Sequence, residues 1–204
     1  FNKMYKSIKN KIRGLAQLAP SPERLKPLNQ LVDYLQMKID KGEKAKLNFI
    51  CTHNSRRSQM AQVWTKLLAD FYEVEVETFS GGTEVTAFYP HAVSVFERMG
   101  LEIKSEKAEN PHYFLSYSKS KKPIEAFSKL YDDAFNPSTN FAAVMTCSSA
   151  DANCPFIPSA ERRISLTYED PKQFDDSEIA AEAYEACALR IAQEMNYVFK
   201  SLKK

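Results

Sequence analysis

The chain has 204 residues, of which 44% are hydrophobic and 26% are charged. These fractions are typical of a globular protein that has enough apolar material for a substantial core. The formal net charge of +2 argues against a general nucleic-acid-binding protein, because such proteins need a concentrated excess of Lys and Arg.

The sequence contains no apolar run long enough for a membrane span, and no signal-peptide pattern opens it. We therefore expect a cytoplasmic protein without a transmembrane segment. In a reducing cytoplasm, cysteines are more often catalytic, metal-binding or buried than paired in structural disulfides. The cysteines to be explained are Cys51, Cys147, Cys154 and Cys187.

Two helices are predicted before residue 46. The first, over about residues 1–18, is basic and amphipathic, and it could lie on a membrane surface or meet a partner. We favour a third interpretation, in which its apolar stripe packs on the protein's own body. The second helix is expected to begin at residue 21 or 26 and to end at residue 40. Residues 1–45 are thus interpreted as a helical N-terminal extension.

From residue 46 onward, apolar strands alternate with amphipathic helices. Short strands are predicted at 47–50, 74–79, 141–145 and 164–166, and helices at 58–71, 91–99 and 177–202. The segment 105–140 is expected to hold one helix near 123–130 and much loop. This alternation indicates an α/β domain over residues 46–204, with an open parallel sheet covered on both faces and ligands at the carboxyl ends of its strands.

The most informative segment is the loop from Cys51 to Ser58, between a buried strand and the start of a helix. Backbone N–H groups in such a loop and the helix N-terminus converge on one tetrahedral anion. Arg57 can fork onto two oxygens of that anion. The same field favours the reactive thiolate of Cys51, and the Ser58 hydroxyl is placed to hydrogen-bond it. The predicted oxyanion-binding residues are Thr52, His53, Asn54, Ser55, Arg56 and Arg57.

This loop, together with the Gln-Met-Ala at 59–61, resembles the low-molecular-weight protein tyrosine phosphatases and, within that superfamily, the thioredoxin-coupled arsenate reductases. The segment 147–155, in which six residues separate two cysteines, resembles the redox segment of those reductases. The Glu-Asp-Pro at 169–171 resembles the element that supplies the general acid. The resemblance covers about residues 46–204 and implies a three-layer α/β sandwich with a four-stranded parallel sheet.

The resemblance implies that the chain reduces arsenate to arsenite through a relay of thiols. Cys51 would attack arsenic while Asp170 protonates the oxygen that leaves. Cys147 would then attack Cys51 and release arsenite, and Cys154 would attack Cys147. Thioredoxin would reduce the resulting Cys147–Cys154 disulfide, so no bound cofactor is expected.

Two other functions stay open. Hydrolysis of phosphotyrosine or small aryl phosphates through a Cys51 phosphocysteine would need only Cys51, Arg57 and Asp170, and the other cysteines would be spectators. Tyr168, just before the Glu-Asp-Pro element, is compatible with this phosphatase alternative. The third possibility is a redox-sensing or anion-binding module whose N-terminal helices contact a partner or a membrane.

The later cysteines have further interpretations. A zinc site at Cys147 and Cys154 is disfavoured, because their spacing exceeds the roughly two to four residues usual for zinc ligands and no nearby His or Cys pair completes the set. No metal is therefore predicted, while a purely structural role of this pair stays open. Cys187 lies on an apolar stripe of the last helix, and we expect it in the core.

Three features of the site depart from the family pattern. His53 stands where Gly is usual, so its ring must point away or help to shape the pocket. Arg56 adds a second positive charge to the loop, which either strengthens anion binding or faces solvent. Some related reductases bind a potassium ion through Asn, Glu and Ser. Asn54 and Ser80 match that set, but Gln62 replaces the acid, so no potassium ion is predicted.

Overall fold

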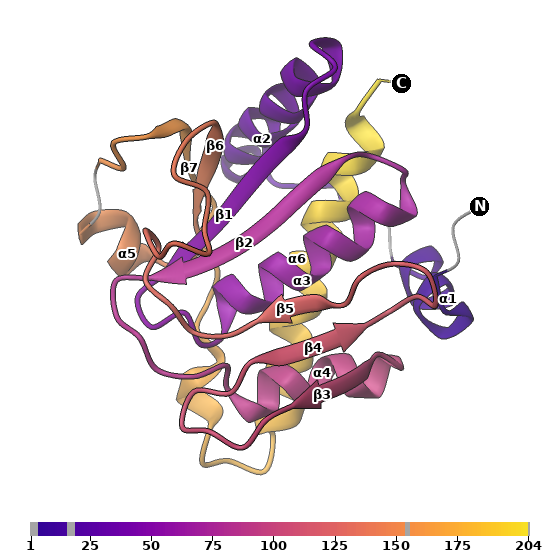
Figure 1. Cartoon of the computed structure of the whole chain (residues 1–204), viewed down its shortest axis with the longest axis vertical. Coiled ribbons are helices and arrows are strands. Elements are labelled where there is room, and N and C mark those ends of the chain that lie inside the picture. The colour runs from indigo at the N-terminus through magenta and orange to yellow at the C-terminus, as the bar shows by residue number, and fades with distance from the viewer. Residues whose placement is uncertain (1–3, 16–18, 154–155, 204) are drawn as a thin grey trace.

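A computed structural model describes residues 4–15, 19–153 and 156–203 of the chain. Its centre is a parallel sheet of four strands in the order β2-β1-β6-β7 (Figure 1). The predicted α/β fold with a four-stranded parallel sheet is therefore confirmed. The strands are β1 (Ala45–Cys51), β2 (Val76–Gly82), β6 (Phe141–Met145) and β7 (Ala160–Ser165).

Both faces of this sheet are covered. Successive side chains of a strand point to opposite faces, and all five residues of β6 are buried. Ala142 and Val144 join the large core with the long helices, whereas Ala143 and Met145 join a smaller cluster that includes Ala150. The helices that contribute to these two layers include α3 (Arg57–Phe71), α5 (Ser148–Asn153) and α6 (Ala180–Ser201).

The N-terminal helices α1 (Lys6–Arg13) and α2 (Pro22–Asp40) belong to the same core as α3 and α6. Helix α1 contacts α4 (Pro90–Met99) and buries its apolar stripe, so the expected packing on the protein's own body is confirmed. Helix α2 lies beside the C-terminal end of α6 (Figure 1), where Lys203 N–H donates a hydrogen bond to the Gln36 side chain. None of the helices in the described part of the chain combines the length and apolarity that a membrane span requires.

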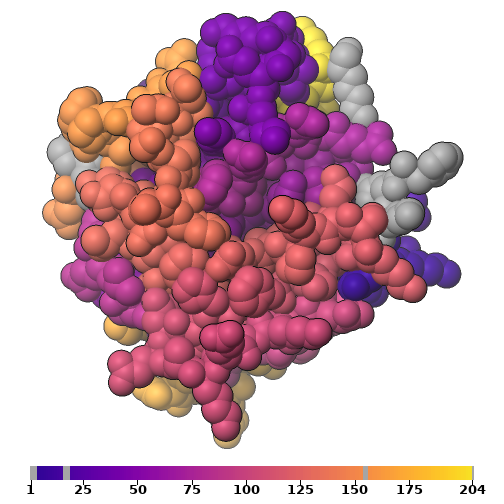
Figure 2. Space-filling view, in the orientation of Figure 1, coloured from indigo at the N-terminus to yellow at the C-terminus, as the bar shows by residue number. Residues whose placement is uncertain are grey.

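A second, antiparallel sheet occupies much of the segment between α4 and β6. Its strands are β3 (Glu102–Ser105), β4 (Tyr113–Ser116) and β5 (Ile124–Ala126). The prediction of a helix near 123–130 is therefore wrong. Ile124 and Ala126 are buried and β5 pairs with β4, so tertiary pairing overrides helix propensity, which is a weak preference. The space-filling view shows this segment, in rose and salmon, over the lower half of one face (Figure 2).

The parallel sheet brings two cysteines to one edge. Cys51 is the last residue of β1 and lies opposite Gly82 at the end of β2. Strand β6 lies on the other side of β1, with Met145 opposite Ile50, and Cys147 follows shortly after it. Ligands of open α/β sheets bind outside the carboxyl ends of the strands, so this edge is the place to look for a site.

Candidate active site

The loop after β1 is pressed against the end of β2. A Cβ atom at Gly82 would lie 2.6 Å from the Thr52 carbonyl oxygen and 2.8 Å from the Asn54 nitrogen, so this close approach requires glycine. Asn54 itself has a φ of +46°, in the left-handed region that asparagine tolerates better than most residues. The loop then leads directly into α3, which begins at Arg57.

A chain of hydrogen bonds ends on the Cys51 sulfur, which is buried. The Ser58 Oγ lies 3.0 Å from the Cys51 Sγ, and the Asn54 side-chain amide donates to the same Ser58 oxygen at 2.8 Å. The Lys129 backbone N–H in turn donates to the Asn54 Oδ1 at 2.9 Å and fixes the amide's orientation. Because Asn54 occupies an acceptor position of the hydroxyl, the Ser58 hydrogen is free to point to the sulfur. This arrangement aims a hydroxyl donor at the Cys51 sulfur, the kind of group from which a thiolate accepts a hydrogen bond.

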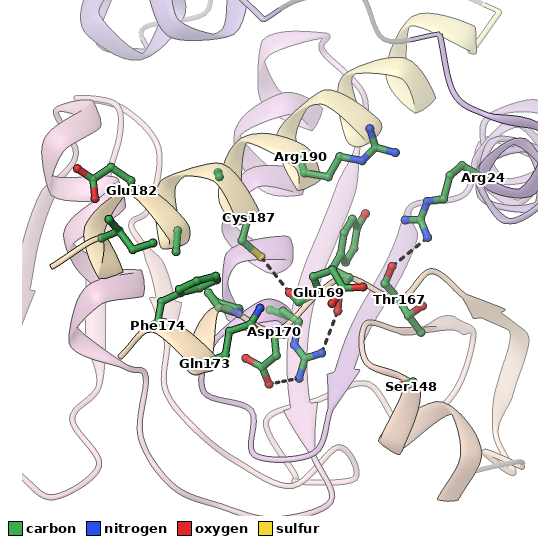
Figure 3. Close-up of a pocket in the computed structure, with 16 residues that line it drawn as sticks. Arg24, Ser148, Thr167, Glu169, Asp170, Gln173, Phe174, Glu182, Cys187 and Arg190 are labelled. Carbon is green, nitrogen blue, oxygen red and sulfur yellow. Dashed lines mark hydrogen bonds and ion pairs between the residues drawn. The ribbon is translucent and has the colours of Figure 1, made fainter. Parts of the chain in front are cut away.

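Arg57 and Asp170, 113 residues apart in sequence, form an ion pair with 2.5 Å between Nη2 and Oδ2. Arg57 also donates from Nη1 to the Tyr168 carbonyl oxygen at 2.9 Å. The dashed line at Asp170 in Figure 3 marks the ion pair. The guanidinium Nε is buried without a hydrogen-bond partner, so Arg57 keeps one donor for a ligand. The structure thus brings the predicted anion-binding arginine and the predicted general acid into contact.

Arg56 points elsewhere, although it is the neighbour of Arg57. Its Nε donates to the Tyr184 hydroxyl, and its Nη2 lies 2.6 Å from the Asp175 Oδ2. The guanidinium carbon lies 4.0 Å from the centre of the Tyr89 ring. From the sequence we expected the Arg56 side chain either to strengthen anion binding or to face solvent. The structure shows neither, because the guanidinium is held by Tyr184, Asp175 and Tyr89. Only the Arg56 backbone remains at the loop.

Two other loop side chains brace the loop instead of facing an anion. The His53 ring is half exposed, with its Nε2 3.3 Å from the Glu84 carboxylate, so it points away from the loop. The Ser55 hydroxyl donates to the Ala87 carbonyl oxygen at 2.7 Å. Like Arg56, these residues can offer only their backbone N–H groups to an anion.

Cys147 lies against the first residue of the loop. Its Sγ is 3.5 Å from the Thr52 Oγ1, and the Ala150 N–H donates to the same sulfur at 3.3 Å. The Cys147 side chain is 1% exposed, and the thiol is free. Cys154, the predicted third member of the relay, lies outside the described residues.

The three residues considered for a potassium ion are hydrogen-bonded within the protein. The Ser80 hydroxyl donates to the Gln62 Oε1 at 2.6 Å, and the Gln62 amide donates to the Glu125 carbonyl oxygen at 3.1 Å. Asn54 serves the Ser58 hydroxyl, as described above. Among the residues that the structure describes, no group of three His, Cys, Asp or Glu side chains could hold a metal ion.

A cavity of about 950 Å³ opens beside the Arg57–Asp170 pair (Figure 3). Phe174 and Cys187 lie on its wall, and the latter comes from α6. Cys187 packs against the core but also faces this cavity, so its predicted place in the core is only partly correct. Burial raises the pKa of the Cys187 thiol to about 12. The cavity could not be predicted from the sequence, because its wall joins α6 to the segment after β7.

Comparison with known proteins gives related sequences, although no family model matches the chain. The chain is 30% identical over 129 residues to an arsenate reductase of Staphylococcus aureus (strain Newman), which is 63% of this chain and 79% of that protein. It is 29% identical over 130 residues to arsenate reductase 2 of Staphylococcus epidermidis, with 63% and 80% covered.

Solved structures share the fold. A low-molecular-weight protein tyrosine phosphatase from T. tengcongensis superposes with a TM-score of 0.51 at 16% identity, over 78% of this chain and 100% of that one. The arginine phosphatase YwlE, solved as a C7S mutant, gives a TM-score of 0.51 at 15% identity, over 78% of this chain and 96% of that one.

Proposed function

Because the chain belongs to the arsenate reductases of the low-molecular-weight protein tyrosine phosphatase superfamily, we propose that it reduces arsenate to arsenite with thioredoxin as the reductant. One observation carries this proposal over simple hydrolysis. A second free thiol, that of Cys147, lies 3.5 Å from the hydroxyl of Thr52, the residue next to Cys51. Phosphoester hydrolysis has no use for a thiol at that place.

In the first step, the loop and Arg57 bind arsenate and the Cys51 thiolate attacks the arsenic atom. An As–S bond forms and an As–O bond breaks, and the hydroxyl that leaves arsenic needs one proton to depart as water. Asp170, a carboxylate while it pairs with Arg57, takes that proton from a second hydroxyl of the bound dihydrogen arsenate and passes it to the leaving oxygen. Asp170 exchanges its contact with Arg57 for this oxygen, while the guanidinium turns to the anion. The product is a thiol-arsenate adduct on Cys51.

In the second step, the Cys147 thiolate attacks the Cys51 sulfur. The S–S bond forms, the S–As bond breaks, and its electron pair stays on arsenic, which leaves as arsenite in the +3 state. The Ala150 N–H, 3.3 Å from the Cys147 sulfur, supports the thiolate needed here. Cys154 then attacks Cys147 and frees Cys51, and the dithiol of thioredoxin reduces the Cys147–Cys154 disulfide. The part of Cys154 is what the resemblance of the segment 147–155 to the redox segment of the arsenate reductases implies.

The test is a paired assay on wild type and Cys147→Ser, with Cys187→Ser as the matched control. Arsenite release is measured with thioredoxin, thioredoxin reductase and NADPH, beside hydrolysis of an aryl phosphate. We expect many turnovers of arsenite from wild type and Cys187→Ser, and none from Cys147→Ser. Undiminished turnover by Cys147→Ser would refute the relay.

A phosphatase activity is the second candidate, and the cavity favours it. Arg57, Asp170 and Phe174 all line this cavity, so an aryl group bound there would lie beside the Arg57–Asp170 pair and against an aromatic ring. Cys51, Arg57 and Asp170 suffice for a phosphocysteine mechanism. If neither the wild type nor any variant forms arsenite, while wild type and Cys147→Ser hydrolyse the aryl phosphate equally, the protein is a phosphatase.

A further inference from the structure

The segment from Thr167 to Asp175, which carries Asp170, is contacted by three arginines, one from α2 and two adjacent ones at the start of α3. Arg57 reaches its middle, at Asp170 itself. The other two, Arg24 and Arg56, reach its two ends. Neither of them touches Asp170.

Arg24, from the N-terminal helix α2, holds the beginning of the segment. Its Nη1 donates to the Thr167 carbonyl oxygen at 2.9 Å, a contact seen in Figure 3. Its Nε and Nη2 bind the two carboxylate oxygens of Glu194 at 2.9 and 2.7 Å. Glu194 is fully buried on α6. The guanidinium carbon of Arg24 lies 5.2 Å from the centre of the Tyr168 ring. A bidentate ion pair of this kind is rigid as well as strong.

Arg56 holds the end of the segment. It binds Asp175, which ends the short helix η1 (Pro171–Phe174) that begins just after Asp170. The Tyr184 hydroxyl donates to the other Asp175 oxygen at 2.5 Å. Burial opposes the charge on Asp175, but the hydrogen bonds from Tyr184 and Arg56 outweigh it and lower the pKa of this carboxyl. The contact therefore stays ionic through the neutral range.

We infer that Arg24 and Arg56 are positioning residues for Asp170. They fix both ends of the segment, so that the Asp170 carboxyl remains over the anion loop while Arg57 exchanges it for a ligand. A catalytic group displaced by about 1 Å can lose about 100-fold in rate, and backbone freedom in this segment would cause such displacement. The inference rests on the proposed role of Asp170 as general acid, and it gives the N-terminal extension a part in the chemistry.

The variants are Arg24→Gln and Arg56→Gln, with Arg190→Gln as the matched control. Arg190 also pairs with Glu194, at 3.0 Å, but it has no bond to the segment from Thr167 to Asp175. Hydrogen exchange of the backbone amides between residues 167 and 175 reports positioning directly. We expect exchange about tenfold faster in the first two variants and unchanged exchange in the control.

The second readout is the rate with aryl phosphates of rising leaving-group pKa, compared with Asp170→Asn. A misplaced acid penalises poor leaving groups most, so Arg24→Gln and Arg56→Gln should approach the steep dependence of Asp170→Asn, with KM within about twofold of wild type. Arg56→Lys should recover part of the effect, because a lysine can still pair with Asp175.

Unchanged exchange in both variants, or rates lowered equally for all leaving groups, would overturn the inference. If wild type and Asp170→Asn show the same leaving-group dependence, the acid role of Asp170 fails. The exchange measurement then still decides whether the two arginines hold the segment.

Discussion

Cys51 ends strand β1 and Cys147 lies just after the neighbouring strand β6 of the same sheet, yet their surroundings differ. Cys51 is bound by Ser58, which Asn54 orients, and Asn54 is held by the Lys129 backbone. Among the described residues, Cys147 has two longer contacts, at 3.5 and 3.3 Å, and it precedes a helix of six residues. An isolated helix of that length is marginal. The difference fits two tasks: an attacking sulfur must stay fixed, and a relay sulfur must move to its partners.

The largest expected effect comes from removing the fixed sulfur. Cys51→Ser should lower both arsenite release and aryl phosphate hydrolysis by roughly 10⁵-fold, because the loss of a nucleophile removes the whole covalent route. Steady-state assays of both reactions measure this, and circular dichroism checks that the fold is kept. More than about one per cent residual activity would show that another group attacks.

The rate at which Cys187 is alkylated tests whether the surroundings of a thiol, rather than its exposure, determine its reactivity. Cys187 faces the cavity, but burial raises the pKa of its thiol from 9.0 to about 12. Its thiolate fraction is then lower by roughly 10³, and iodoacetamide should label it about that much more slowly than a free thiol. Peptide mapping by mass spectrometry measures the order of labelling. Labelling of Cys187 as fast as that of Cys51 would contradict the expectation.

Removing the hydrogen bond from Ser58 tests most directly whether the surroundings of Cys51 and Cys147 differ in their effect on reactivity. Ser58→Ala removes a bond to a charged sulfur, which is worth about 2–3 kcal/mol, so the first chemical step should slow roughly 50-fold. Thr52→Val, which removes only the 3.5 Å contact to Cys147, is the matched control and should change that step little. Single-turnover kinetics of adduct formation distinguish them. Equal losses in the two variants would remove the contrast between the two sulfurs.

The smallest effect concerns the free energy of unfolding, through Lys129, whose backbone N–H holds Asn54 beside Cys51. Lys129 is buried between Phe127 and Phe135, and burial lowers the pKa of its ammonium from 10.5 to about 8. The unfolded chain therefore binds more protons between these pH values, so the wild type gains stability as pH rises through that window. Lys129→Met should be more stable by about 2 kcal/mol at pH 7.

Urea unfolding from pH 7 to 10.5 measures this difference between Lys129→Met and wild type. The advantage of the variant should shrink above pH 8 and vanish near pH 10.5, the two pKa values of Lys129 in the folded and unfolded chain. An advantage that stays constant over this range would assign it to packing rather than to the buried charge.

The parts of the site that are local in sequence could be predicted. The strand, loop and helix around Cys51 are continuous, so their pattern was sufficient to predict Cys51 as the nucleophile and the loop from Cys51 to Ser58 as the anion-binding loop. The directions in which the side chains of the adjacent Arg56 and Arg57 point could not be predicted from residue type. The backbone at Arg56, with φ −125° and ψ −86°, decides them by turning one guanidinium to Asp175 and the next to Asp170.

The segment between residues 105 and 140 was predicted poorly for a related reason. Its short strands pair with one another and pack on α3, where Gln62 binds the Glu125 carbonyl oxygen of β5. Such pairing depends on partners that are distant in sequence, so a local helix-like composition was misleading. Asp170 was predicted as the general acid only through the family resemblance, since an Asp before a Pro is common in turns.

The ion pair between Arg24 and Glu194 also bears on how the protein is made. It joins residues 170 positions apart, so the brace on Thr167 cannot form until the last helix has left the ribosome. Contacts of such long range slow folding, because the chain must first close a large loop. During synthesis, the sheet and the Cys51 loop can form before Arg24 and Glu194 fix the segment from Thr167 to Asp175. The nascent chain would then hold a reactive thiol before it has a fixed proton donor.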